Sequence, residues 1–89
     1  MLKKYRKQID KIDRKFVKLF EKRMGISKRI GEFKKANNME IFDAKRETEI
    51  LSERTSQIKN NEYVEYCKEF FEKIILISKE IQNKSRGNL

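Results

Sequence analysis

One arginine at a position that should be apolar is the first sign of chemistry in this sequence. Apolar residues recur at steps of three and four from Leu2 to Phe33, a spacing that predicts one face of a helix. The pattern requires an apolar residue at position 23, where the sequence has Arg23. An inward-facing arginine can bind the carboxylate of a ligand, pair with a buried acidic side chain, or extend its charged end to the surface. Arg23 alone does not decide between a binding site and a structural role.

The second predicted helix begins with polar residues on a face that later becomes apolar. Asp43, Arg46 and Glu47 lie at helical spacing before Ile50, Leu51 and Arg54, so all six share this face. Asp43 also suits a helix N-cap, and Arg46 and Glu47 also suit a solvated first turn, where an acidic side chain interacts well with the helix dipole. Each residue therefore has a structural interpretation beside the functional one.

The third predicted helix carries polar residues in the same way. Phe71, Ile75, Ser78 and Gln82 follow one another at helical spacing, so an apolar stripe continues into hydrogen-bonding side chains. A fraying helix end would give a similar pattern. Sites in helical bundles are built from inward-facing side chains on adjacent helices, and all three predicted helices supply such side chains. Together they predict a polar binding site between the helices.

The composition limits the chemistry of such a site. The chain has no histidine and one cysteine, which excludes imidazole chemistry, an internal disulfide and a Cys/His zinc cluster. Its net charge of +9 fits an anionic partner, which could be a nucleic acid, a membrane surface or a small acid. The basic residues are mostly lysines spread among acidic residues, a pattern typical of a solvated surface. The charge alone does not select the partner.

Three helices are needed to position these side chains. The sequence has 89 residues, no proline and only three glycines, and 42% of its residues are charged, which favours long helices over strands. One all-α domain is expected over residues 1–84, with a flexible tail over 85–89. The predicted elements are a helix from Leu2 over about 33 residues, a turn at 36–39, a helix at 43–58, a turn at 59–61 and a helix from Tyr63 to Ile81.

The first predicted helix is too long for one small domain. At 1.5 Å per residue, about 33 residues extend over roughly 50 Å, which exceeds the width of a compact globule of this size. The two shorter helices must also cover each other and cannot cover its whole apolar face, so a second chain is expected. The longest apolar run, residues 74–77, is too short to span a membrane, and a cytoplasmic protein without a membrane partner is expected.

Four short patterns occur in order along the chain. They are Arg6 followed by Ile9 and the pair Ile12-Asp13, Arg23 followed by Lys34 with Ile30-Gly31 between them, the run Asp43-Ala44-Lys45-Arg46-Glu47, and Ser78 followed by Gln82. Their order and spacings resemble the all-helical class of chorismate mutases, from Leu2 to about Asn83. Two features depart from that family, namely Gly25 inside the first helix and the absence of the proline that some relatives carry before the second helix.

The resemblance implies an intertwined homodimer of L-shaped three-helix protomers, with two equivalent active sites and no cofactor or metal. The implied reaction is the rearrangement of chorismate to prephenate in aromatic amino-acid biosynthesis. This unimolecular step needs no proton, electron or metal, so it suits a protein without histidine. Each site would be completed by the partner's Arg6. The site residues implied within the same chain are Arg23, Lys34, Asp43, Arg46, Glu47, Ser78 and Gln82.

The resemblance also implies a role for each residue. Arg23 and the partner's Arg6 would hold the two carboxylates of chorismate in the folded, reactive conformation. Lys34 and Gln82 would stabilise the negative charge that develops on the ether oxygen as the C–O bond breaks. The contacts to the ring hydroxyl and the remaining polar lining would come from Glu47, the backbone near Asp43, Arg46 and Ser78.

Three other functions stay open at the level of the sequence. A lyase of the isochorismate-pyruvate type resembles the mutases in fold and cationic site, so only its product would distinguish it. A basic helical dimer that binds nucleic acid would show steep salt dependence, but gives no role to the inward-facing Arg23, Glu47 and Gln82. A purely structural coiled-coil dimer would tolerate a leucine in place of Arg23. The resemblance favours the mutase, with no nucleic-acid partner.

Overall fold

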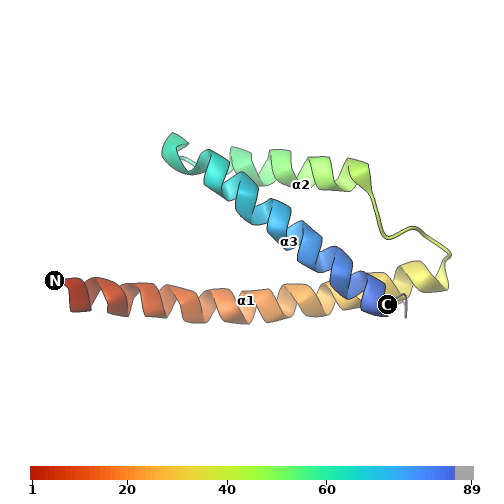
Figure 1. Cartoon of the computed structure of the whole chain (residues 1–89), viewed down its shortest axis with the longest axis horizontal. Coiled ribbons are helices and arrows are strands. Elements are labelled where there is room, and N and C mark those ends of the chain that lie inside the picture. Colours follow the sequence, from red (N-terminus) through yellow and green to blue (C-terminus); the bar gives the residue numbers. More distant parts are fainter. Residues whose placement is uncertain (86–89) are drawn as a thin grey trace.

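The computed structural model describes residues 1–85 as three α-helices and one turn of 3-10 helix, with no strand among these residues (Figure 1). The elements are α1 (Leu2–Ala36), α2 (Ala44–Ser56), the 3-10 turn η1 (Asn61–Tyr63) and α3 (Val64–Ser85). The predicted all-α fold with three helices, one of them very long, is therefore confirmed. Of the predicted tail, Ser85 is the last residue of α3, and residues 86–89 lie outside the described part of the chain.

Asparagine and aspartate side chains set the boundaries of the loop between α1 and α2. Asn37 follows the last residue of α1 and donates from its side chain to the Phe33 carbonyl at 2.8 Å. Asn38 has a φ of 51°, in the left-handed region that asparagine tolerates better than most residues. At the start of α2, Asp43 Oδ1 accepts from the Arg46 backbone N–H at 3.0 Å. The predicted turn and the helix cap considered for Asp43 are both confirmed.

The second helix is shorter than predicted, because it ends at Ser56 rather than Ile58. Near this end, Thr55 Oγ1 donates to the Leu51 carbonyl at 2.7 Å. Side-chain bonds of this kind compete with a regular helix and are common where a helix ends. Asn60 then caps η1 through its side chain, so the chain turns before α3 begins. Hydrophobic spacing alone does not show these local hydrogen bonds.

The third helix lies between the other two and packs against both (Figure 1). It crosses the C-terminal half of α1, while the N-terminal half of α1 extends past the crossing. The radius of gyration is 16.0 Å, whereas a compact chain of this length has a value of about 12 Å. The longest dimension is 54 Å, in agreement with the length expected for the first helix. The single chain is therefore elongated rather than globular.

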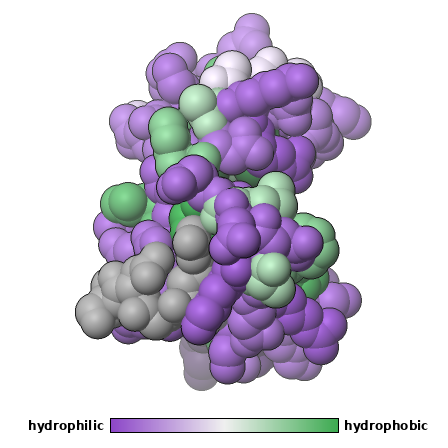
Figure 2. Space-filling model, turned by 90° about the vertical axis from the view of Figure 1, so that its right-hand side faces the viewer, coloured by the Kyte–Doolittle hydropathy of each residue, from purple (hydrophilic) through white to green (hydrophobic). Residues whose placement is uncertain are grey.

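The buried apolar core is small for a chain of this length. Its members are Met24, Ile41, Ile50, Ile74 and Ile75. The surface seen from the right-hand side of Figure 1 is mainly hydrophilic, as the high content of lysine and glutamate predicts (Figure 2). No helix within residues 1–85 combines the length and apolar character that crossing a bilayer requires.

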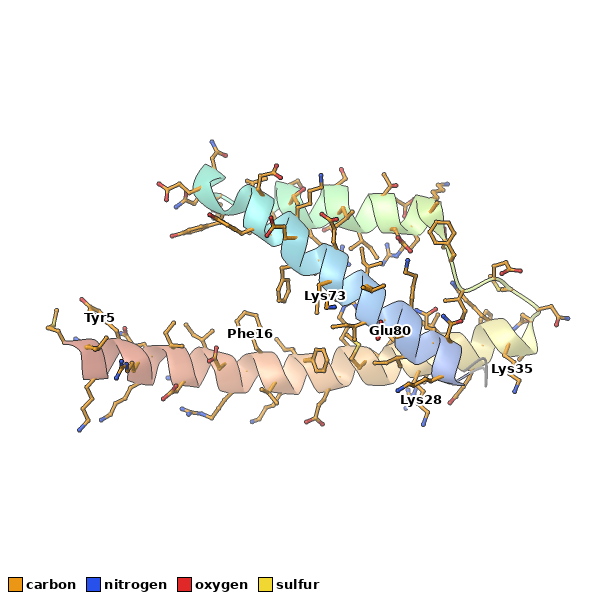
Figure 3. The ribbon with its side chains drawn as sticks, in the orientation of Figure 1. Tyr5, Phe16, Lys28, Lys35, Lys73 and Glu80 are labelled. Carbon is orange, nitrogen blue, oxygen red and sulfur yellow. The ribbon has the colours of Figure 1, made fainter. Side chains whose placement is uncertain are left out.

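An apolar face of α1 is left uncovered in the single chain. Tyr5 and Phe16 project from the side of α1 that faces α3, whereas Lys28 and Lys35 project from the opposite side (Figure 3). The N-terminal members of this face are 48% to 62% exposed, and they are Leu2, Tyr5, Ile9, Ile12, Phe16 and Leu19. The regular spacing that predicted a buried stripe is present, but residues 1–85 of this chain do not bury it.

A glycine allows α1 and α3 to approach each other closely. A Cβ atom added at Gly31 would lie 2.6 Å from the Gln82 carbonyl oxygen and 2.8 Å from the Gln82 Cα atom, and would also overlap the Ser85 hydroxyl. Two of these neighbours are backbone atoms that cannot rotate away. Gly31 therefore fixes the distance between the helices beside Gln82, one of the predicted site residues.

We expect Gly31→Ala to lower the free energy of unfolding by about 1 to 3 kcal/mol, because the added methyl group must push the two helices apart. Gly25→Ala is the matched control, since nothing lies within 4 Å of its added Cβ. That change should raise stability by about 0.5 to 1 kcal/mol through helix propensity. Urea unfolding of both variants measures the difference. Equal stability of the two variants would contradict the close approach of α1 and α3.

Candidate active site

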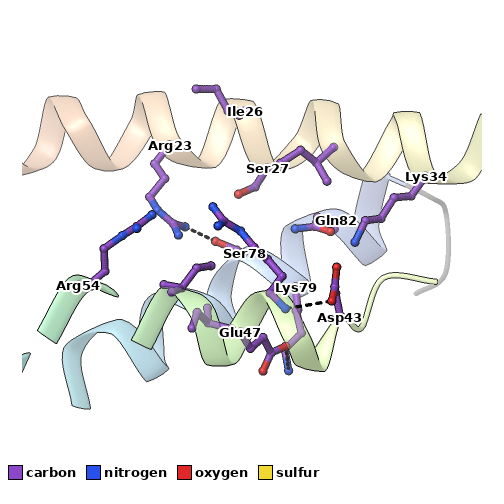
Figure 4. A pocket seen from close by; sticks show the side chains of 14 residues that line it. Arg23, Ile26, Ser27, Lys34, Asp43, Glu47, Arg54, Ser78, Lys79 and Gln82 are labelled. Carbon is purple, nitrogen blue, oxygen red and sulfur yellow. Dashed lines mark hydrogen bonds and ion pairs between the residues drawn. The ribbon is translucent and has the colours of Figure 1, made fainter. Parts of the chain in front are cut away.

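The three helices border a partly open cavity of about 280 Å³ on the side of α3 that faces α1 and α2 (Figure 4). Its apolar walls are Ile26 and Ile30 of α1, Ile50 of α2 and Ile75 of α3. Seven of the eight site residues named from the sequence line it: Arg23, Lys34, Asp43, Arg46, Glu47, Ser78 and Gln82. The inward polar positions of the three helices thus meet in one space.

Arg23 occupies one end of this cavity. Its Nη1 donates to Ser78 Oγ at 2.5 Å, and the Ser78 hydroxyl lies 3.9 Å from Met24 Sδ. Burial lowers the pKa of Arg23 most, followed by the nearby charges of Arg54 and Arg46. No acidic residue among residues 1–85 forms an ion pair with Arg23. The buried ion pair considered from the sequence is therefore not found in the described chain, and the guanidinium keeps N–H donors for an anion.

Lys34 and Gln82 lie at the other end. Lys34 Nζ donates to the Ile41 carbonyl at 3.0 Å, which ties the last turn of α1 to the loop before α2. Gln82 Oε1 is buried and has no hydrogen-bond partner within the described residues. Rotation of the amide by 180° exchanges its oxygen with its NH₂ group, so the same position can present a donor. A buried amide oxygen without a protein partner, beside a cavity, is satisfied by an ordered water molecule or by a bound polar ligand.

The two acidic residues that line the cavity are both engaged within the chain. Asp43 caps the helix, as described above, and also lines the cavity. Glu47 forms an ion pair with Lys79 at 3.1 Å, and Lys79 Nζ lies 5.2 Å from the centre of the Phe42 ring. Arg46 is more exposed, and its contact with Glu49 on the outer surface is long at 3.9 Å. The sequence left open that both side chains simply face solvent in the first turn of the helix. This interpretation fits Arg46 better than Glu47.

The sequence interpretation did not assign a site role to two cations that line the cavity, Arg54 and Lys79. Arg54 lies seven residues after Glu47, so both share the inward face of α2. Lys79 lies four residues after Ile75 on α3. Helical spacing had already placed Arg54 on the inward face without a role, and the same spacing would have included Lys79.

Arg6 is the one predicted site residue that the single chain does not bring to the cavity. It lies in an exposed part of α1, seventeen residues before Arg23. At 1.5 Å per residue the two are about 25 Å apart along the helix. Within one chain, Arg6 therefore cannot act together with the other seven.

The charge balance of the cavity indicates what it can bind. Five cationic side chains and two carboxylates line it, which leaves an excess of three positive charges. Arginine and lysine donors around a small space suit a ligand with carboxylate or phosphate groups. Among residues 1–85, no group of three or more histidine, cysteine, aspartate and glutamate side chains is placed to hold a metal ion.

Comparison with known proteins identifies similar sequences. The family described as chorismate mutase type II matches residues 5–83. A bifunctional chorismate mutase/prephenate dehydratase of Aquifex aeolicus (strain VF5) is 44% identical over 50 residues. This match covers 56% of the present chain and 14% of the relative, so the chain corresponds to a small part of that longer protein. No solved structure matches.

Proposed function

Because the chain belongs to the chorismate mutase type II family, we propose that it converts chorismate to prephenate by an intramolecular Claisen rearrangement, a step of aromatic amino-acid biosynthesis. The observation that carries the proposal is the cavity itself, which collects seven polar side chains of the family pattern from three helices. Chorismate is a small dianion, and the cavity carries an excess of positive charge. A site of this kind needs no cofactor or metal for a unimolecular rearrangement, so none is proposed.

Binding and folding of the substrate would be the first task of the site. Chorismate reacts only when its enolpyruvyl arm lies over the ring, so both carboxylates must be held in that geometry. Arg23 would grip one carboxylate through its free N–H donors, because guanidinium and carboxylate groups pair through two parallel hydrogen bonds. The burial that lowers the pKa of Arg23 also strengthens its attraction to an anion.

Stabilisation of the developing charge would be the second task. As the C–O bond breaks, negative charge grows on the ether oxygen, and donors aimed at that atom stabilise the transition state more than the substrate. Lys34 is held at the cavity by the Ile41 carbonyl, and the buried Gln82 Oε1 has no hydrogen-bond partner within residues 1–85. We assign both to the ether oxygen. Lys34 contributes the larger effect because it carries a full charge.

The ring hydroxyl would be bound by the α2 side of the cavity. Glu47 would accept from this hydroxyl, together with the backbone near Asp43. Lys79 pairs with Glu47 at 3.1 Å, and this pairing reduces the repulsion between the Glu47 carboxylate and a dianionic substrate. Arg46 and Ser78 complete the polar lining.

A second copy of the chain would cover the apolar face of α1 and complete the site. An apolar groove of about 570 Å³ runs between α1 and α3, where the rings of Phe16 and Phe70 are 6.4 Å apart. The exposed apolar face of α1 continues from this groove toward Leu2. A helix from a second chain would bury both, and its length would carry the partner's Arg6 to the cavity. We therefore propose an intertwined homodimer in which the partner's Arg6 holds the second carboxylate.

The proposal is tested by the products formed from two substrates. The purified protein is incubated separately with chorismate and with isochorismate, and the products are identified by nuclear magnetic resonance. Prephenate from chorismate is the expected result. Pyruvate and salicylate from isochorismate, with chorismate left unchanged, would instead assign the chain to the lyase reaction on the same fold. The assignment of residues 1–84 to the catalytic domain and a cytoplasmic location stay predictions.

A further inference from the structure

Arg54 is a cavity cation that the mechanism above leaves without a role. It lies in the last turn of α2, on the face that also carries Glu47 and Ile50, and its side chain lines the cavity. The side chain is 30% exposed, so most of it is removed from water. It extends from α2 toward Arg23 of α1, so the two guanidinium groups approach one end of the cavity from different helices (Figure 4).

Within residues 1–85, neither guanidinium group pairs with an acidic side chain that lines the cavity. Arg23 donates to the neutral Ser78 hydroxyl. Arg54 pairs with Glu53, its neighbour in the sequence, whose side chain is 49% exposed and does not line the cavity. Among the charges that lower the pKa of Arg23, Arg54 has a larger effect than Arg46. Two repelling cations at the end of a small cavity form a favourable position for one anionic group.

We propose that Arg54 is a substrate-binding residue that grips, together with Arg23, the same carboxylate of chorismate. This inference rests on the proposed function and adds a residue to its binding site. The exposed ion pair with Glu53 contributes little stability and does not prevent the guanidinium from binding a ligand. Two arginines on one carboxylate also fix its orientation better than a single one, because each offers donors in a planar fork.

The kinetic effect of this contact differs from that of Lys34. Arg23 remains in an Arg54 variant and still holds the carboxylate in the reactive geometry. The carboxylate carries the same charge in chorismate and in the transition state, so the added contact of Arg54 stabilises both states alike. Loss of such a contact raises KM and leaves kcat nearly unchanged. We expect Arg54→Gln to raise KM about 10- to 100-fold, with kcat within about threefold of the wild-type value.

Glu53→Gln is the matched control, because it removes the ion pair from the other side and leaves Arg54 in place. If Arg54 binds substrate, Glu53→Gln keeps the wild-type KM, whereas a purely structural ion pair predicts the same change in both variants. Arg54→Lys keeps the charge but loses the fork, so its KM should be intermediate. This third variant also decides the question if Arg54→Gln does not fold.

The measurement is the steady-state rate of prephenate formation by all four proteins, with thermal unfolding followed in parallel. A raised KM in Arg54→Gln and an intermediate KM in Arg54→Lys, beside an unchanged Glu53→Gln, support the inference. Wild-type KM in the Arg54 variants, or equal changes in Arg54→Gln and Glu53→Gln, overturn it while the proposed function stands. Absence of chorismate turnover by the wild-type protein overturns the proposed function and this inference with it.

Discussion

Lys34→Ala is expected to lower kcat about 100- to 1000-fold, the range found when one donor to a developing oxyanion is removed. Lys34 Nζ lies at the cavity and is held by the Ile41 carbonyl at 3.0 Å, so it is already oriented before substrate binds. The charge that it would stabilise on the ether oxygen grows only as the C–O bond breaks. The loss should therefore appear in kcat at saturating chorismate, measured as the rate of prephenate formation.

The neighbouring lysine provides a control for this experiment. Lys35 belongs to the same last turn of α1, but it does not line the cavity, and its side chain projects from the side of α1 that faces away from α3 (Figure 3). Lys35→Ala removes the same charge and the same side-chain length, and we expect it to keep the wild-type kcat. A Lys34→Ala protein with a kcat close to that of Lys35→Ala would show that Lys34 does not contact the reacting oxygen.

Arg6→Ala and Arg23→Ala are each expected to lower activity at least about 100-fold, because a charged partner of a substrate carboxylate is lost from a partly desolvated site. If each site takes Arg23 from one chain and the partner's Arg6, a mixed dimer of the two variants contains one intact site. Random association makes about half of the dimers mixed, so the mixture should regain about one quarter of the wild-type activity. Co-refolding of equal amounts of the two variants measures this recovery.

A second mixture controls for recovery through better folding. Arg23 and Lys34 line the same cavity of one chain, so a mixed dimer of Arg23→Ala and Lys34→Ala has a defect in both sites. This mixture should stay as inactive as its parents. Recovery in both mixtures, or in neither, would contradict a site that is shared between two chains through Arg6.

The sequence predicted the helices and most of the cavity lining for one physical reason. A helix in a small bundle must place apolar residues at steps of three and four, so a polar residue at such a step is conspicuous. Arg23 was found in this way, as were Glu47 and Gln82, and the cavity contains all three. The family pattern then assigned roles that spacing alone could not supply.

Other features could not be predicted because they depend on contacts between segments distant in the sequence. The ion pair of Glu47 with Lys79 and the close approach of Gly31 to Gln82 require the helix crossing to be known. Helical spacing placed Arg54 on the inward face of the second helix, but spacing does not show that its guanidinium group lies beside that of Arg23 (Figure 4). At the end of α2, the backbone N–H groups of Gln57 and Ile58 donate to carbonyls three residues earlier, and hydrophobic periodicity does not show these bonds.

The role of the cavity is tested most directly by the rate of prephenate formation from chorismate, measured for the wild-type protein and for Arg23→Leu. Leucine suits the apolar spacing of α1, so the variant should fold and melt at least as high as the wild-type protein. We expect prephenate to form rapidly with the wild-type protein and at a rate near that of the uncatalysed reaction with Arg23→Leu. A variant that retains turnover, or a wild-type protein that forms no prephenate, would contradict the assignment of this cavity as a chorismate mutase site.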